Sequence, residues 1–117
     1  RIALAVAEVN GCDYCLSAHT YLGVNVAKLG GDEIAAARDA HSSDAKADAA
    51  LRFARRVAET HGQVSDAELA TLRAAGFDDA EVIEIVVNVA LNVLTNYVNN
   101  VAQTDIDFPK VSAKLAA

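Results

Sequence analysis

The stretch "DDAEVIEIVVNVALNVLTNYVNNV", residues 78–101, decides the fold of this chain. Its apolar residues cover most of the circumference of a helix, and the pattern is far longer than a typical strand. The acidic residues of its first turn complement the positive end of a helix dipole. We therefore predict one long helix that begins near Asp78 and ends near Val101.

This predicted helix carries more apolar residues than one buried stripe requires. A helix that is apolar nearly all round is buried nearly all round, and a domain of 117 residues can rarely enclose one on every side. We therefore expect a homo-oligomer in which a second copy covers the helix. The alternative is that further helices, upstream of Arg1, cover it.

The rest of the chain also follows helical spacing, interrupted by turn residues. Ser65 and Glu68 fit a capping box, and Asp32 and Asp44 are placed to cap two other helices. The expected helical ranges are 1–9, 12–29, 32–39, 45–61 and 65–76. Together with the long helix they predict an all-α, single-domain bundle of about six helices over residues 1–117.

Composition limits the function classes. Hydrophobic residues make up 53% of the chain, and the net charge of −6 argues against nucleic acid and anionic membranes as partners. Glu84, Asn88 and Asn92 interrupt the most apolar stretch, so we expect no membrane span. Two cysteines do not make a disulfide-stapled secreted scaffold, and we expect a cytoplasmic protein. Because the chain starts at Arg1 and contains no Met, we expect its natural N-terminal part to be missing.

Both cysteines lie in the segment "VNGCDYCLSAHT", residues 9–20. At 100° per residue, Cys12, Cys15 and His19 fall within roughly 60° of arc on one helix face. The thiolate is the nucleophilic form of cysteine, and a helix N-terminus or a neighbouring histidine favours it. A second cysteine three residues away can then close a local disulfide on an oxidised first one. The pattern favours thiol redox catalysis.

Four other interpretations of the cysteines stay open. A structural disulfide that closes so short a loop would stabilise the fold little. A structural zinc site usually needs four ligands, and this cluster supplies three. A thioredoxin-like motif would need strands that the sequence does not predict. Two buried cysteines without any chemistry are the last alternative.

The segment "NGCDYCLSAHT", residues 10–20, resembles the alkylhydroperoxidase D-like family of the carboxymuconolactone decarboxylase-like superfamily. The stretch 48–100 and the closing "DIDFP", residues 105–109, also look like these proteins, so the resemblance covers nearly the whole chain. It implies an all-helical fold, assembly as trimers or hexamers, and thiol-dependent reduction of hydroperoxides. It implies no cofactor, and a dithiol, thioredoxin or lipoyl-type group as reductant.

Within that resemblance, Cys15 matches the cysteine that attacks the peroxide, Cys12 the resolving cysteine, and His19 the histidine that helps to deprotonate the thiol. The family's relay glutamate, twelve residues before Cys12, would fall immediately before Arg1, and its role is not transferred to Glu8. Asp13-Tyr14 stands where the best-known members carry a histidine. The alternative function is a non-peroxidatic carboxymuconolactone decarboxylase-like enzyme or a redox-sensing oligomer.

Asparagines at positions 88, 92, 96 and 99 follow helical spacing and form a polar stripe on the long apolar helix. Buried polar groups need hydrogen-bond partners. The stripe would line a pocket beside the cysteines, or it would bond within the structure or across a subunit interface; we favour the second. Tyr14, between the cysteines, is expected to be a packing residue.

Overall fold

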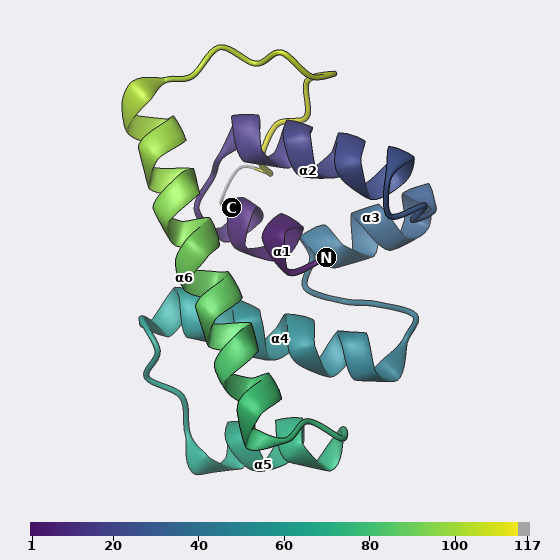
Figure 1. Cartoon of the computed structure of the whole chain (residues 1–117), viewed down its shortest axis with the longest axis vertical. Helices are drawn as coiled ribbons and strands as arrows, with labels where there is room; N and C mark the ends of the chain where they lie inside the picture. Colours follow the sequence, from purple (N-terminus) through teal and green to yellow (C-terminus); the bar gives the residue numbers. More distant parts are fainter. Residues whose placement is uncertain (115–117) are drawn as a thin grey trace.

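The computed structural model describes residues 1–114, which form six α-helices and no strand (Figure 1). This confirms the predicted all-α fold and the number of helices. The helices are α1 (Ile2–Val9), α2 (Asp13–Asn25), α3 (Gly31–Arg38), α4 (Ala45–Thr60), α5 (Asp66–Ala74) and α6 (Asp79–Ala102).

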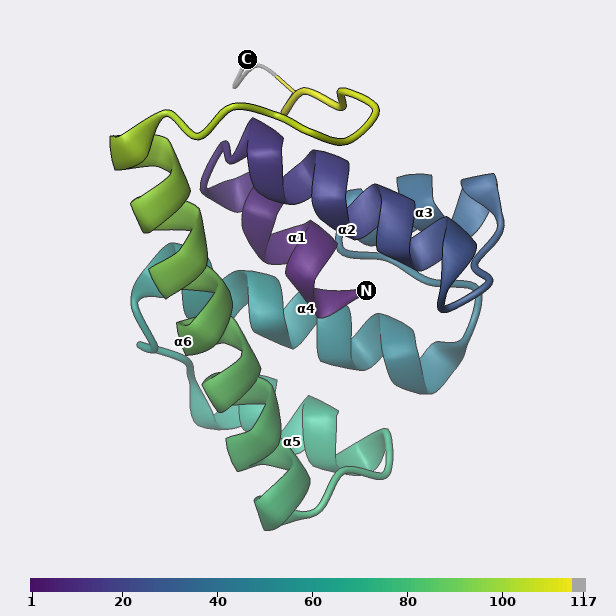
Figure 2. The same cartoon turned by 45° about the horizontal axis from the view of Figure 1, so that its top comes forward.

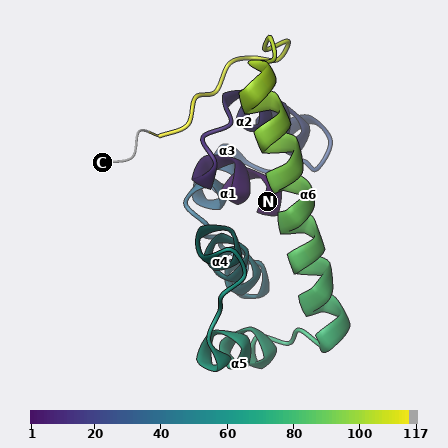
Figure 3. The same cartoon turned by 90° about the vertical axis from the view of Figure 1, so that its left-hand side faces the viewer.

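The short helix α1 lies at the centre and contacts α2, α3, α4 and α6. Figure 3 shows α6 along one side of the stack that the other helices form. One group of buried side chains surrounds the junction of α1, α2 and α3 and includes both cysteines. A second group fills the space between α4, α5 and α6. The cysteines therefore lie inside the core, at its α2 end.

Side-chain caps begin three of the helices, at the predicted positions Asp44 and Ser65 and also at Asp78. The Asp44 side chain accepts a hydrogen bond from the backbone amide of Ala47 at 2.7 Å. Ser65 forms a capping box with Glu68 at the start of α5, and Asp78 does so at the start of α6. These local bonds satisfy amides that a helix N-terminus leaves free, which explains why they could be predicted.

Two predicted helix ends are wrong. The second helix ends at Asn25 and not near Leu29, because the amide of Leu29 bonds back to the carbonyl of Gly23 and closes the turn early. Lys28 takes a positive φ of 57° in that turn. The cap of α3 is Gly30, while Asp32 lies in the first turn, where its charge still complements the dipole.

After α6 the chain returns across the outer side of α2 (Figure 2). The amide of Val111 donates to Ser17 Oγ at 2.8 Å, and the amide of Ala113 donates to Asp13 Oδ1 at 2.8 Å. The Phe108 ring packs edge-on against Tyr14, with centroids 6.0 Å apart. Tyr14 is thus a packing residue, as expected, and the tail holds the first turns of α2 in place.

The face of α6 that points away from the stack is apolar and exposed. Figure 3 shows no other helix on that side. Its large apolar side chains are Ile83, Val86, Val87, Leu91, Leu94, Tyr97, Val98 and Val101. Among the described residues, α6 is also the one helix whose length and mean hydropathy of 1.3 would suffice for a membrane span, a measure that core helices meet as well.

Candidate functional site

Cys12 and Cys15 form a disulfide at the start of α2, with their Cα atoms 5.2 Å apart. The turn from α1 into α2 makes this possible, because Gly11 takes a positive φ of 61°, which glycine adopts at little cost. The amide of Cys12 then donates to the carbonyl of Ala7 at 3.0 Å. Cys12 is thereby placed at the N-cap of α2, one turn before Cys15.

The helix N-terminus acts directly on the sulfur of Cys12. Its Sγ accepts a hydrogen bond from the backbone amide of Cys15 at 3.2 Å, which is the bond that an N-cap side chain makes. The helix dipole adds a positive potential at the same place. Cys12 is fully buried, whereas Cys15 keeps an exposed fraction of 3%. Both sulfurs therefore lie at a site that favours negative charge and largely excludes water.

His19 lies one turn further along α2 and is half-buried. It lines a cavity of about 270 Å³ together with apolar residues of α1 and α2, and with Arg1. Burial of the imidazole lowers the pKa of His19. Within residues 1–114, no hydrogen bond joins His19 to either sulfur. The cavity that His19 lines contains neither cysteine, so the structure places His19 one helical turn beyond Cys15 without a hydrogen bond between them.

Asn99 of α6 reaches the cysteine pair. Its Nδ2 donates to Cys15 Sγ at 3.5 Å and to the carbonyl of Thr95 at 2.9 Å. The asparagine spacing in the sequence was the signal for this residue, but the sequence favoured a structural or interface role, which is wrong for Asn99. Asn99 is the residue of the stripe that contacts the cysteine pair.

The other asparagines near this end of α6 hold the turn before Cys12. Asn10 Nδ2 donates to Asn96 Oδ1 at 3.0 Å, and Asn100 Nδ2 donates to the carbonyl of Asn10 at 2.9 Å. Asn96 is fully buried, and its Nδ2 has no partner within residues 1–114. The structural role expected for the stripe therefore holds for Asn96.

Glu8 lies apart from this chemistry. Its carboxylate accepts a hydrogen bond from Arg38 Nε at 2.7 Å and another from the backbone amide of Lys114. These bonds tie α1 to α3 and to the tail. Glu8 therefore has a structural role in this fold.

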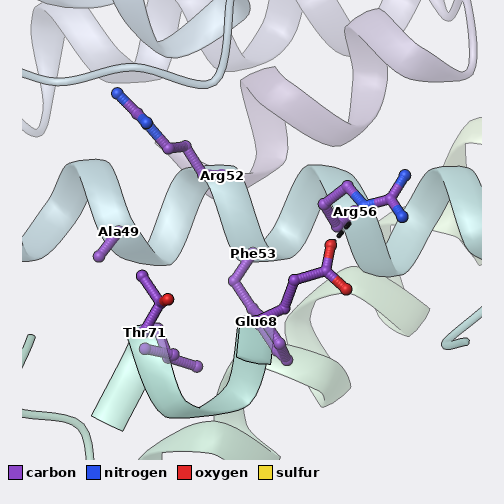
Figure 4. A pocket seen from close by; sticks show the side chains of 7 residues that line it. Ala49, Arg52, Phe53, Arg56, Glu68 and Thr71 are labelled. Carbon is purple, nitrogen blue, oxygen red and sulfur yellow. Dashed lines mark hydrogen bonds and ion pairs between the residues drawn. The ribbon is translucent and has the colours of Figure 1, made fainter. Parts of the chain in front are cut away.

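Elsewhere, residues 1–114 hold no group of three or more His, Cys, Asp or Glu side chains that could share a metal ion. A separate cavity of about 240 Å³ lies between α4 and α5, with Phe53 and Leu72 in its lining (Figure 4). At its edge Arg56 and Glu68 form an ion pair of 2.6 Å. This cavity contains none of the residues of the cysteine site.

The fold and the site together define an all-α protein with a buried Cys-x-x-Cys disulfide at a helix N-terminus. The model of the carboxymuconolactone decarboxylase family matches residues 1–60, just over half of the 117 residues. The chain therefore belongs to the carboxymuconolactone decarboxylase family. The match contains α1 to α4 and the whole cysteine segment, which confirms the resemblance seen in the sequence.

Among solved structures, the chain is similar to an uncharacterized peroxidase-related protein from Silicibacter sp. TM1040. The TM-score is 0.70 and the sequence identity 24%, so this likeness shows the fold. The match covers 94% of this chain and 56% of the other, so the chain spans little more than half of that protein. No curated protein matches the chain.

Proposed function

We propose that the protein is a thiol-dependent peroxidase that reduces hydroperoxides through the Cys12–Cys15 pair. The observation that carries this proposal is the disulfide at the N-terminus of α2, with His19 one turn beyond it. The pair closes its disulfide within the first turn of α2, so it can cycle between dithiol and disulfide locally. The family match and the name of the Silicibacter protein, "peroxidase-related", support the same chemistry.

In the first step the thiolate of Cys15 attacks one oxygen of the hydroperoxide. A sulfur–oxygen bond forms, the oxygen–oxygen bond breaks, and Cys15 becomes a sulfenic acid. The leaving alkoxide takes up a proton and departs as an alcohol, or as water when the substrate is hydrogen peroxide. Cys15 suits this role because, of the two cysteines, it alone keeps an exposed fraction.

In the second step Cys12 attacks the sulfur of Cys15. The disulfide forms, the sulfur–oxygen bond breaks, and hydroxide leaves as water after it takes up a proton. An external dithiol, such as thioredoxin or a lipoyl-type group, then reduces the disulfide and becomes oxidised itself. The cycle needs no cofactor. We place the protein in the cytoplasm, where such donors keep thiols reduced.

His19 serves in this proposal as the base that takes the proton of the Cys15 thiol. Burial lowers the pKa of His19, which favours the neutral imidazole that can accept this proton. The relay glutamate implied by the resemblance would directly precede Arg1. Arg1 and His19 line the same cavity.

We propose further that the protein works as a homo-oligomer, a trimer or a hexamer. The exposed apolar side chains of α6 support this, since patches of this kind mark interfaces between subunits. A second copy of the chain would cover them without touching the opposite face of α6, where Asn99 lies.

The test is hydroperoxide consumption by the purified protein with dithiothreitol as reductant. We expect Cys15→Ser to abolish turnover. Without dithiothreitol, we expect Cys12→Ser to stop after one equivalent of hydroperoxide at a sulfenic acid, which dimedone traps on Cys15. We expect His19→Gln to slow the reaction at least about tenfold, because a positioned base contributes on this scale or more. His41→Gln, at an exposed loop histidine, is the matched control and should leave the rate unchanged. Full turnover in Cys15→Ser would refute the proposal.

The alternative, a redox-sensing oligomer or a non-peroxidatic enzyme of the family, uses the same fold. The disulfide favours a redox role, because a decarboxylase of this family does not need paired cysteines. A sensor would form the disulfide once for each oxidant molecule and would show no multiple turnover with excess dithiothreitol. Steady-state kinetics over many equivalents of hydroperoxide therefore separates a sensor from a peroxidase.

A further inference from the structure

We infer that Asn99 is a thiolate-binding residue, which donates its side-chain amide to Cys15 when the disulfide is reduced. This inference rests on the proposed function, because it concerns the sulfur that would attack the hydroperoxide. Its starting point is the contact of 3.5 Å between Asn99 Nδ2 and Cys15 Sγ. One asparagine of the α6 stripe would thus contribute directly to the chemistry of Cys15.

The orientation of the Asn99 amide is determined by its second bond. Nδ2 also donates to the carbonyl of Thr95 at 2.9 Å, and a carbonyl oxygen accepts only from a donor. A flipped amide would place its oxygen against the Thr95 carbonyl and lose that bond. The amide nitrogen therefore faces Cys15, with one N–H for the carbonyl and the other for the sulfur.

No charged group of α6 competes with this amide. Beyond Glu84, α6 contains no Asp, Glu, Lys or Arg. The titratable groups of the elements packed against this end of α6 include Asp13, Tyr14 and His19 of α2, and Glu8 of α1. Asp13 binds the amide of Ala113, and Glu8 binds Arg38, so neither carboxylate donates or accepts at the sulfur.

The chemistry that follows is a charge-assisted hydrogen bond. Bonds from an N–H to an ionised acceptor are roughly twice as strong as neutral ones. The amide therefore stabilises the thiolate of Cys15 more than its thiol, and it raises the thiolate fraction at neutral pH. The N-cap bond acts on Cys12, whereas Asn99 acts on Cys15, so the two sulfurs are stabilised by different elements.

The experiment measures the rate of Cys15 alkylation by iodoacetamide against pH, in a Cys12→Ser background. Serine at position 12 keeps the N-cap bond, because its hydroxyl accepts from the same amide. We expect Asn99→Asp to move the pH midpoint of alkylation up by about one unit or more, which is roughly tenfold less thiolate below the midpoint. Asn99→Ser, which adds no charge, should move it up by a smaller amount.

Asn88→Asp is the matched control. Asn88 lies on the same helix, makes the same kind of bond to its own backbone at Glu84, and does not touch the cysteines. We expect it to leave the midpoint unchanged. Unchanged midpoints in both Asn99 variants, with circular dichroism equal to that of the parent, would overturn the inference.

The alkylation experiment needs no hydroperoxide. The proposed role of Asn99 and the proposed peroxidase activity can therefore be refuted independently of each other. A shifted midpoint in the Asn99 variants supports the inference whether or not the protein reduces hydroperoxides. The absence of turnover in the unmodified protein would refute only the peroxidase.

Discussion

The two faces of α6 differ in polarity, and in the second half of the helix polar side chains are buried while apolar ones are exposed. In the second half of the helix, Asn92 and Asn96 are buried against the rest of the chain, while Leu91 and Leu94 are exposed. In the first half, Val82, Ile85 and Val89 are buried as a core face normally is. The inner face thus changes from apolar to amide along its length, and the outer face stays apolar throughout.

This difference shows that the two faces have different tasks. The inner amides bond to particular groups, at Asn10 and at Cys15, and so place the cysteine turn relative to α6. Within residues 1–114 the outer side chains are exposed, and the proposed homo-oligomer would cover them. The predictions below test this assignment, from the largest expected effect to the smallest.

Two isoleucines of α6 test the apolar half of the inner face. Ile85 is 5% exposed and Ile83 is 62% exposed. We expect Ile85→Ala to lower the free energy of unfolding by about 2–5 kcal/mol, because it leaves a cavity in the core. Ile83→Ala should change it by less than about 0.5 kcal/mol at concentrations where the chain is a monomer. Urea denaturation of both variants measures the two values, and equal losses would break the comparison.

Two leucines test the outer face. We expect the double variant Leu91→Glu with Leu94→Glu to convert the proposed oligomer into a monomer of about 12.2 kDa, because charge is costly at an apolar interface. Sedimentation equilibrium gives the mass, and circular dichroism shows whether the helices remain. If the unmodified chain is already monomeric, the outer face needs another explanation.

Asn100 tests the anchoring of the cysteine turn. Its side chain donates to the backbone carbonyl of Asn10, two residues before Cys12. We expect Asn100→Ala to cost about 0.5–1.5 kcal/mol, the net value of one hydrogen bond. Asn88→Ala, which removes only a bond within α6, should cost less. Thermal unfolding of the two variants measures the difference, and a larger loss at Asn88 would contradict the anchoring role.

Acid sensitivity should come from outside α6, because the inner face of α6 works through neutral amides. The Ser42 hydroxyl, followed by the amide and hydroxyl of Ser43, lowers the pKa of Glu33 from 4.5 to about 2. A carboxyl whose pKa is lower in the folded state stabilises the fold above the unfolded pKa, and this stability is lost as pH falls. We expect Glu33→Gln to give a shallower fall of Tm between about pH 4.5 and pH 2.

Asp32→Asn, in the same turn of α3, is the control for this acid titration. If Glu33→Gln and Asp32→Asn reduce the fall of Tm at acidic pH equally, the effect comes from the change in net charge. If neither variant changes the curve, Glu33 does not contribute to acid sensitivity in the predicted way.

Much of this architecture could be predicted because it depends on neighbours in the sequence. The capping boxes at Ser65 and Asp78 involve residues three positions apart, and the helix start at Cys12 follows from the Asn10-Gly11 turn. The end of α2 could not be predicted in the same way. It depends on bonds that Leu29 makes back to Gly23 and on the packing of Leu29 against the core.

By itself, the sequence determined the six helices, the family to which the chain belongs, and the proximity of Cys12, Cys15 and His19 on one helix. The helices follow from the spacing of apolar and capping residues, and the shared face of the three side chains follows from the period of one helix. Neither needs a tertiary contact. Only the tertiary structure decided which groups from other helices meet the cysteines. Asn99 lies 84 positions after Cys15, and its contact with the sulfur exists because α6 packs beside α1 and α2. The reason is physical: helical periodicity gives the face on which a residue lies, but only packing gives what that face touches.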